Sequence, residues 1–287
     1  MNAWIAEALR SHLGAGGRLL GQRPLSGGCI NRATRLETTR GPLFLKHHPA
    51  PPHADLFVRE AESLAALRAT GALVVPEVIA AQRSAAERPA YLLTEFLEPG
   101  APDDAQLGRG LAALHRTTAD RYGFAHDNYC GATPQDNARH DNWTTFWGEQ
   151  RIGHLLQLLR RTRGLSADEE ATYGRLLQRL PTVLSHRPAP ALTHGDLWSG
   201  NVMHTARGPA LIDPACAWAD RETDLALMHM FGGFAEATWA AYREAFPLEA
   251  GWRERRGLYE LYHYLNHYLL FGGGYGPQAL RIARGYL

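Results

Sequence analysis

Cysteine is scarce in this chain of 287 residues, which contains only Cys29, Cys130 and Cys216. Three scattered cysteines do not build a disulfide framework, and there is no Cys-x-x-Cys pair and no His-Glu-x-x-His motif. The fourteen histidines are spread along the chain, and His263/His267 is the pair closest to a metal-ligand spacing. We interpret that pair as polar or substrate-facing, and we expect a reducing, cytoplasmic setting.

An excess of charge of either sign is also lacking. The chain has 30 basic and 29 acidic residues, a formal net charge of +1 and no long basic run, which argues against nucleic acid as a partner. No stretch of eighteen apolar residues occurs, and Met1–Glu7 lacks the basic and apolar regions of a signal peptide. We therefore expect a cytoplasmic protein without a membrane partner, and both a monomer and a dimer are compatible with the sequence.

The patterns that are present indicate two lobes. Extended patterns dominate the first third of the chain and helical patterns the rest, which predicts an α+β protein with a small antiparallel-sheet N-lobe over 1–97 and a larger, mainly helical C-lobe over 98–287. We expect strands at 18–25, 29–37, 42–47, 77–82 and 90–96, and two short strands at the apolar runs Val202-Met203 and Leu211-Ile212. We expect helices at 2–13, 54–69, 103–118, 142–162, 167–185, 221–231, 235–245 and 252–271.

The most informative segment is His194-Gly195-Asp196-Leu197-Trp198-Ser199-Gly200-Asn201, which is followed by Leu211-Ile212-Asp213. In kinases, an Asp orients the attacking hydroxyl, and an Asn and a second Asp hold magnesium, in this order along the chain. We therefore predict Asp196 as the catalytic residue and Asn201 and Asp213 as ligands of Mg²⁺, an ion that prefers hard oxygen ligands.

A second set of residues is predicted to bind ATP. Lys46 ends an expected strand and Glu60 lies on the next expected helix, as in kinases where a strand Lys contacts the α/β-phosphates and pairs with a helix Glu. The turn at Gly27 and Gly28 allows backbone amides to approach phosphates, although such a turn alone more often marks an ordinary hairpin. The expected hinge that meets adenine is the backbone of Glu95, Phe96 and Leu97.

Other positions carry two interpretations each. Asp224 either caps a helix or accepts amide hydrogen bonds from the catalytic loop, and we predict that it supports this loop together with His194. Trp198 either packs on the acceptor substrate or anchors the core, and His267 is either a packing residue or a substrate contact. Cys29 is either an oxidisable thiol that gates nucleotide entry or a quiet small residue.

These residues resemble the fructosamine-3-kinase (ketosamine-3-kinase) family, which has the aminoglycoside-phosphotransferase and protein-kinase-like fold. The string from His194 to Asn201 is the most specific match, and the resemblance extends over about residues 20 to 276. Further matching segments are Gly27-Gly28-Cys29-Ile30-Asn31, Phe44-Leu45-Lys46, Leu111-Ala112-Ala113-Leu114-His115, Gly131-Ala132-Thr133-Pro134-Gln135-Asp136-Asn137 and Phe231-Gly232-Gly233-Phe234.

The resemblance implies a two-lobed protein-kinase-like fold that uses ATP and Mg²⁺ to phosphorylate the 3-hydroxyl of ketosamines. Ribulosamine, erythrulosamine or fructosamine on lysine and protein amines would be the acceptors, so ketosamines and glycated proteins are the implied partners. Because the 3-phosphate decomposes and frees the amine, the implied role is protein deglycation. Two alternatives stay open: a kinase of another small molecule, such as an aminoglycoside, choline or a sugar, and a non-catalytic protein that only binds nucleotide.

Overall fold

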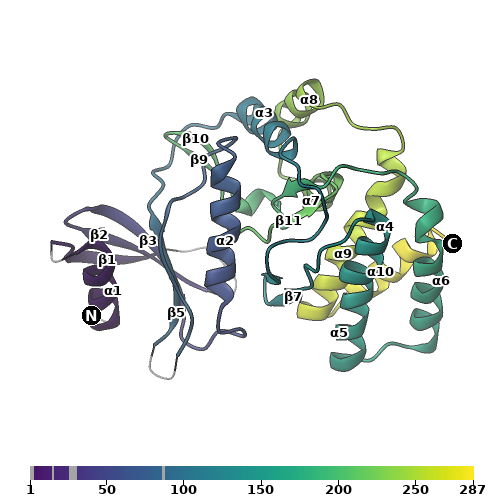
Figure 1. Ribbon diagram of the computed structural model, residues 1–287, viewed down its shortest axis with the longest axis horizontal. Helices are drawn as coiled ribbons and strands as arrows, with labels where there is room; N and C mark the ends of the chain where they lie inside the picture. The colour runs from purple at the N-terminus through teal and green to yellow at the C-terminus, as the bar shows by residue number, and fades with distance from the viewer. Residues whose placement is uncertain (1–2, 15, 26–30, 86–87) are drawn as a thin grey trace. The chain divides into compact units, whose positions relative to one another are not determined.

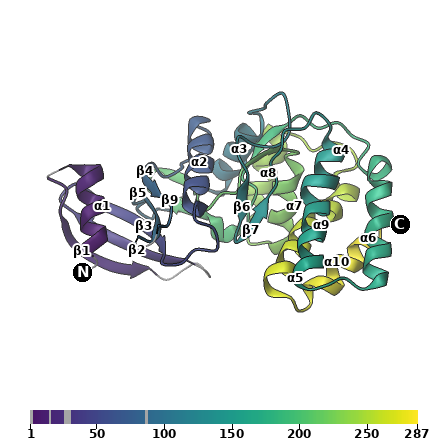
Figure 2. The same cartoon turned by 60° about the horizontal axis from the view of Figure 1, so that its bottom comes forward.

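The computed structural model describes residues 3–14, 16–25, 31–85 and 88–287, which form two compact units (Figures 1 and 2). Unit 1 comprises Met1–Asp103 and Met203–Asp213, and unit 2 comprises Asp104–Val202 and Pro214–Leu287. The chain therefore passes three times from one unit to the other. Within the described residues, every helix is too short or too polar to cross a membrane.

Unit 1 is built on one antiparallel sheet whose strand order is β1-β2-β3-β5-β4. The predicted strands are present within a few residues of their expected bounds. At the β2–β3 turn, Gly41 has a φ of +100°, a conformation that favours glycine. The strands are β1 (Leu19–Leu25), β2 (Arg32–Thr38), β3 (Gly41–His48), β4 (Val78–Gln82) and β5 (Ala90–Glu95).

The two helices of unit 1 pack on opposite faces of this sheet. Successive side chains of a strand point to opposite faces, so Leu45 and Lys46 of β3 point in opposite directions. Leu45 belongs to the apolar cluster that includes Leu9 of α1 (Ala3–Leu13). Lys46 bonds to Glu60 of α2 (Leu56–Ala69) on the other face. The alternation of side-chain directions along β3 thus separates the face that packs on α1 from the face that carries Lys46 of the predicted ATP site.

A hairpin from the middle of the chain also belongs to unit 1. It consists of β9 (Val202–Thr205) and β10 (Gly208–Leu211). Single β-bridges join Thr205 to Pro99 and Ala210 to Val74, so the hairpin continues the backbone hydrogen bonding of unit 1. This pairing brings Asp213, which follows β10, to the unit that contains Lys46.

Unit 2 is mainly helical, and the α+β prediction is confirmed. The expected helix at 142–162 consists of α4 (Trp143–Phe146), a π-helical segment (Trp147–Gly153) and α5 (His154–Thr162). Its apolar face packs on α9 in the large core of this unit. The remaining helices are α3 (Asp104–His115), α6 (Ala167–Val183), α7 (Glu222–Phe231), α8 (Glu236–Ala245), α9 (Trp252–Phe271) and α10 (Tyr275–Arg284).

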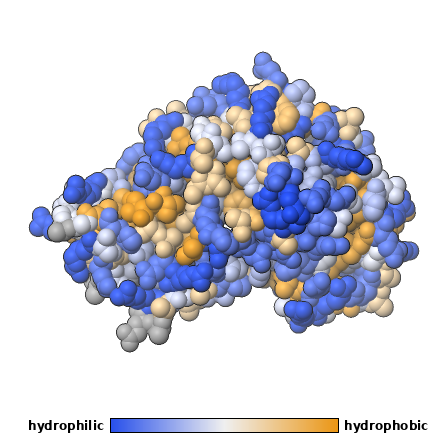
Figure 3. Space-filling view, in the orientation of Figure 1, coloured by the Kyte–Doolittle hydropathy of each residue, from blue (hydrophilic) through white to orange (hydrophobic). Residues whose placement is uncertain are grey.

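Two short strand pairs and one helix were not predicted from the sequence. The strand pairs are β6 (Asn128–Cys130) with β7 (Thr133–Gln135) and β8 (Ala191–Thr193) with β11 (Ala217–Ala219). Three residues are too few to show a strand period, whereas α10 was missed after a run of glycines. On the face drawn in Figure 3, polar side chains predominate and apolar residues form smaller areas between them, because most of the large apolar residues lie in the cores of the two units.

Candidate active site

The loop that carries Asp196 begins where β8 ends. β8 pairs with β11, and the N–H of Ala215 donates a hydrogen bond to the carbonyl of His194 (2.8 Å). Gly195 has a φ of +81°, and a Cβ at this position would lie 2.0 Å from the carbonyl oxygen of Ala215. The loop therefore requires glycine at position 195, and it ends in a short 3₁₀ turn at Ser199–Asn201.

Asp224 holds the start of this loop from the first turn of α7. Its carboxylate accepts hydrogen bonds from the backbone N–H groups of His194 (2.7 Å) and Gly195 (2.9 Å) and contacts Nε2 of His115 (3.2 Å). Burial alone would raise the pKa of Asp224, but the hydrogen bond and charge of His115, together with His194 and the Gly195 amide, lower it below its usual value. These contacts match the loop-supporting interpretation of Asp224.

Asp196 and Asn201 are linked within the loop. Nδ2 of Asn201 donates to the carbonyl of Asp196 (2.8 Å) and also lies 3.3 Å from its carboxylate oxygen Oδ2. The N–H of Asp196 donates to Nδ1 of His194 (3.3 Å), which places His194 in the support of the loop. Because Nδ2 of Asn201 is used in this way, its Oδ1 is the amide atom suited to a metal ion.

Lys46, Glu60 and Asp213 form a charged network in unit 1. Nζ of Lys46 lies 2.9 Å from both carboxylate oxygens of Glu60 and 3.0 Å from Oδ1 of Asp213. Burial would lower the pKa of Lys46, but the charges of Asp213 and Glu60 raise it, so the amine stays protonated. Burial and the negative charge of Asp213 raise the pKa of Glu60 to about 7 against the opposing effect of Lys46.

The backbone at Asp213 is strained. Its φ is +55°, and it is the only non-glycine residue with a positive φ in the described part of the chain. Such conformations cost roughly 1–3 kcal/mol and cluster at functional sites. Together with its hard carboxylate oxygens, this strain fits Asp213 to the predicted Mg²⁺ role.

The remaining residues of the predicted ATP site are described only in part. Gly27 and Gly28, and with them Cys29, lie outside the described residues. The N–H of Glu95 donates to the carbonyl of Glu77 (3.0 Å), the ring of Phe96 stacks with the guanidinium of Arg35 (4.2 Å), and Leu97 is buried. An adenine that bonds to the N–H of Glu95 would have to replace the bond to Glu77, so we expect the other hinge groups to carry that contact.

The two predicted acceptor contacts belong to one aromatic row in unit 2. Trp198 is 42% exposed, and its ring centroid lies 6.3 Å from that of Phe231, which is 43% exposed. The ring of Phe231 lies 5.3 Å from that of His267, which in turn lies 5.0 Å from Tyr275. Burial lowers the pKa of His267, whose Nδ1 bonds to the carbonyl of His263 (2.7 Å). Phe231 and Tyr275 have no role that was predicted from the sequence.

Similarity to known proteins agrees with this geometry. A family model described as Fructosamine kinase matches residues 1–287. A "Probable ketoamine kinase" of Synechocystis sp. is 39% identical over 285 residues (98% of this chain and 95% of the relative). The chloroplastic "Protein-ribulosamine 3-kinase" of Arabidopsis thaliana is 38% identical over 271 residues (92% and 81%).

Solved structures agree as well. A structure from Thermobifida fusca that is assigned as a fructosamine-3-kinase has a TM-score of 0.85 at 31% identity and covers 100% of this chain and 99% of its own. Aminoglycoside phosphotransferase APH(4)-Ia, solved with ADP and hygromycin B, has a TM-score of 0.64 at 16% identity over 98% of both chains, and this likeness shows the fold alone. The chain has the kinase-like fold that its sequence predicts, belongs to the fructosamine kinase family, and is a kinase.

Proposed function

We propose that this protein transfers the γ-phosphoryl group of ATP to the 3-hydroxyl of a ketosamine, and that this step leads to deglycation of lysine and protein amines. The observation that carries the proposal is the braced loop of unit 2, in which Asp224 fixes the backbone before Asp196 and Asn201 fixes the backbone after it. The names of the relatives, ketoamine kinase and protein-ribulosamine 3-kinase, support the acceptor class.

Each charged residue has a proposed task in this reaction. Asp196 accepts the hydrogen of the acceptor hydroxyl and orients it, which suits the loose transition state of phosphoryl transfer because positioning matters more there than strong basicity. Lys46, held by Glu60, binds the α/β-phosphates. Asn201 and Asp213 are proposed as the ligands of Mg²⁺, which would neutralise charge on the phosphates.

The remaining assignments follow the same scheme. We propose that the lobe at 1–97 binds ATP through Gly27 and Gly28 and through the backbone of 95–97. The lobe at 98–287 would carry the catalytic loop and the acceptor site, with Trp198 and His267 beside the acceptor. The exposure of the Trp198 ring supports this role, because an exposed ring can contact an acceptor, whereas a buried one cannot. Tryptophan also combines an apolar ring with a polar N–H, which suits contact with a sugar amine.

The test is ADP release from Mg²⁺–ATP with three separate acceptors: a ribulosamine of lysine, a fructosamine of lysine, and kanamycin. We expect release with a ketosamine and none with kanamycin, and we expect Asp196→Asn to abolish it while ATP binding persists. Lys46→Ala should instead weaken ATP binding, because Lys46 is proposed to contact the phosphates. Turnover of kanamycin alone would move the protein to another acceptor class, and unchanged turnover in Asp196→Asn would overturn the role of Asp196.

A further inference from the structure

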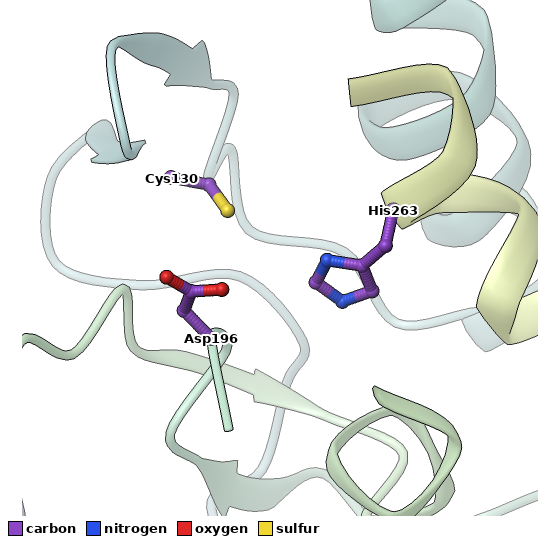
Figure 4. Close-up of side chains that lie close together, drawn as sticks. All are labelled: Cys130, Asp196 and His263. Atoms are coloured by element: carbon purple, nitrogen blue, oxygen red, sulfur yellow. The ribbon is translucent and has the colours of Figure 1, made fainter. Parts of the chain in front are cut away.

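A second arrangement of potential metal ligands lies at the catalytic loop. Cys130 at the end of β6, Asp196 in the loop and His263 in α9 each offer one ligand atom, and these atoms all lie within 4.8 Å of one another. All three residues belong to unit 2. Figure 4 shows the thiol, the carboxylate and the imidazole directed toward a common space from three different elements.

Two of the three side chains are buried, and a metal ion would have to displace the proton of the Cys130 thiol, whose pKa is raised by burial and by the charge of Asp196. His263 is 4% exposed, and its Nδ1 is a buried nitrogen without a hydrogen-bond partner in the described structure. This nitrogen is therefore available as a ligand atom for a metal ion. Cys130 is 2% exposed, and its sulfur accepts a hydrogen bond from Nδ2 of Asn266 (3.3 Å), which fixes the thiol.

The chemistry of this set selects zinc over magnesium. Thiolate, imidazole and carboxylate are the usual ligands of Zn²⁺, whereas Mg²⁺ takes oxygen ligands such as those of Asn201 and Asp213. In a tetrahedral zinc site, neighbouring ligand atoms are about 3.4–3.6 Å apart, so atoms that lie within 4.8 Å of one another would have to approach by at most about 1 Å. Rotation of the half-buried Asp196 side chain can supply much of that movement.

A second cluster in unit 2 also brings three potential metal ligands together, but its carboxylates already have cationic or hydrogen-bonding partners. His186, Asp220 and Glu222 also lie within 4.8 Å of one another. However, the guanidinium of Arg255 donates to both carboxylate oxygens of Glu222 (2.6 and 2.8 Å), and Asp220 accepts a hydrogen bond from Tyr259 (2.6 Å). These carboxylates are already neutralised or hydrogen-bonded, so this cluster is a structural network and serves as a comparison.

We propose that Cys130, Asp196 and His263 bind Zn²⁺, with water as the fourth ligand, and that bound zinc inhibits the kinase. Binding forms a zinc–thiolate bond and releases the thiol proton to solvent, with no change of oxidation state. The inhibition rests on the proposed function, because it requires that the carboxylate of Asp196 serve the acceptor hydroxyl. The binding itself does not depend on that function.

Binding is tested with Co²⁺ as a spectroscopic substitute for Zn²⁺ on the full-length protein without nucleotide. We expect one equivalent of Co²⁺ to produce a thiolate-to-cobalt charge-transfer absorption that Zn²⁺ abolishes. Cys130→Ser and His263→Gln should weaken the affinity for Co²⁺ by more than about tenfold. Replacing a residue that only hydrogen-bonds to a metal ligand already weakens metal affinity by about tenfold, and loss of a ligand itself should cost more. Cys216→Ser is the matched control, because Cys216 is a buried cysteine outside both clusters, and it should keep the full absorption.

Three results would overturn the binding proposal: no absorption in the unmodified protein, an absorption that persists in Cys130→Ser, or one that is lost in Cys216→Ser. Circular dichroism and thermal unfolding of each variant show that it is folded. If Cys130→Ser does not fold, His263→Gln and Cys130→Ala carry the same comparison.

Inhibition is tested by ketosamine-dependent ADP release at saturating Mg²⁺–ATP with buffered free Zn²⁺. We expect at least about a tenfold loss of activity in the unmodified protein, whereas Cys130→Ser and His263→Gln keep their activity at the same zinc concentration. Equal inhibition of all three proteins would place the inhibitory zinc elsewhere and overturn this part. Absence of ADP release without zinc would instead refute the proposed function, and the cobalt spectra would still decide the metal site.

Discussion

Replacing Asp224 by Asn tests its support of the catalytic loop, and comparison with Asp220→Asn distinguishes that support from a general loss of stability. Asp224 is 1% exposed and accepts the N–H groups of His194 and Gly195, directly before Asp196. Asparagine has nearly the same shape, but only one of its two terminal atoms accepts hydrogen bonds. One of the two backbone N–H groups would therefore face an NH₂ group, and the loop would have to shift to avoid this contact.

The expected magnitudes follow from these two bonds. A buried donor without a partner costs about 1–3 kcal/mol, and the other bond loses its charge assistance, so we expect a loss of about 3 kcal/mol in the free energy of unfolding. For a chain of this size that corresponds to a decrease in Tm of about 6–12 °C. If the shift moves Asp196 by about 1 Å, kcat falls by about 100-fold.

The matched control is Asp220→Asn, because Asp220 is equally buried but supports a different structure. Its carboxylate accepts hydrogen bonds from Tyr259 (2.6 Å), from His186 (2.7 Å) and from the backbone N–H of Glu222 at the start of α7 (3.0 Å), and none of these donors lies in the catalytic loop. We expect a comparable decrease in Tm by scanning calorimetry but a kcat close to that of the unmodified protein, measured by ADP release well below both transitions. An equal loss of kcat in the two variants, or an unchanged kcat in Asp224→Asn, would refute the supporting role of Asp224.

The remaining predictions concern packing, backbone conformation and pH. Gly108→Ala in α3 should destabilise the protein by about 3 kcal/mol, because the added Cβ would lie 2.2 Å from the carbonyl of Thr238. Gly174→Ala in α6 should instead stabilise it by up to about 1 kcal/mol, because the added Cβ meets no atom within 4 Å. Thermal unfolding of the two variants tests this difference. Gly195→Ala should lower kcat and Tm together, since position 195 has a positive φ and no room for a Cβ, and a normal kcat would contradict this. The pKa of Glu60 is raised from 4.5 to about 7 in the folded state, so the folded state binds this proton more tightly than the unfolded state does. The stability that the bound proton contributes is therefore fully present below about pH 4.5 and is lost as the pH rises through 7. In metal-free buffer, the Tm of the unmodified protein should therefore fall relative to that of Glu60→Gln between pH 4.5 and 7, and parallel Tm curves would show that Glu60 does not titrate in this range.

The fold was largely predictable from the sequence because its long elements have strong periods. β3 contains the apolar run Leu43-Phe44-Leu45, α2 has an apolar stripe that includes Phe57, Leu64 and Leu67, and α6 begins at the Ser166–Glu169 capping box. The short strands that were not predicted depend on tertiary contacts. β8 is a strand only because β11 lies beside it, and the π-helical turn at Trp147–Gly153 leaves no mark on the 3.6-residue period.

The site residues that could be predicted are those whose order along the chain matches the order of catalytic roles in kinases. Lys46, Glu60 and Asp213 meet in unit 1, and Asp196, Asn201 and Asp224 meet in unit 2, as the order of kinase roles along the chain implies. The approach of Cys130 and His263 to Asp196 was not predictable, because three residues from distant segments share no spacing signal. The sequence spacing instead indicated His263/His267 as the histidine pair closest to a metal-ligand spacing. In the structure, His267 lies in an aromatic row with Phe231 and Tyr275.

The two halves of the candidate site differ in how their charges are balanced. In unit 1, two carboxylates share the one ammonium group of Lys46, so the network of Lys46, Glu60 and Asp213 carries an excess negative charge when all three groups are ionised. Burial raises the pKa of Glu60, and the negative charge of Asp213, whose backbone is strained, adds to this effect. In unit 2, Asp224 is stabilised by amide hydrogen bonds and by His115, and its pKa is lowered. A cation at Asp213 would remove part of the repulsion that raises the pKa of Glu60, because it would offset the second carboxylate charge. The pKa of Glu60 would then be lower, so a larger fraction of its carboxylate would be ionised beside Lys46, and the metal ion would strengthen the ion pair that is proposed to position ATP.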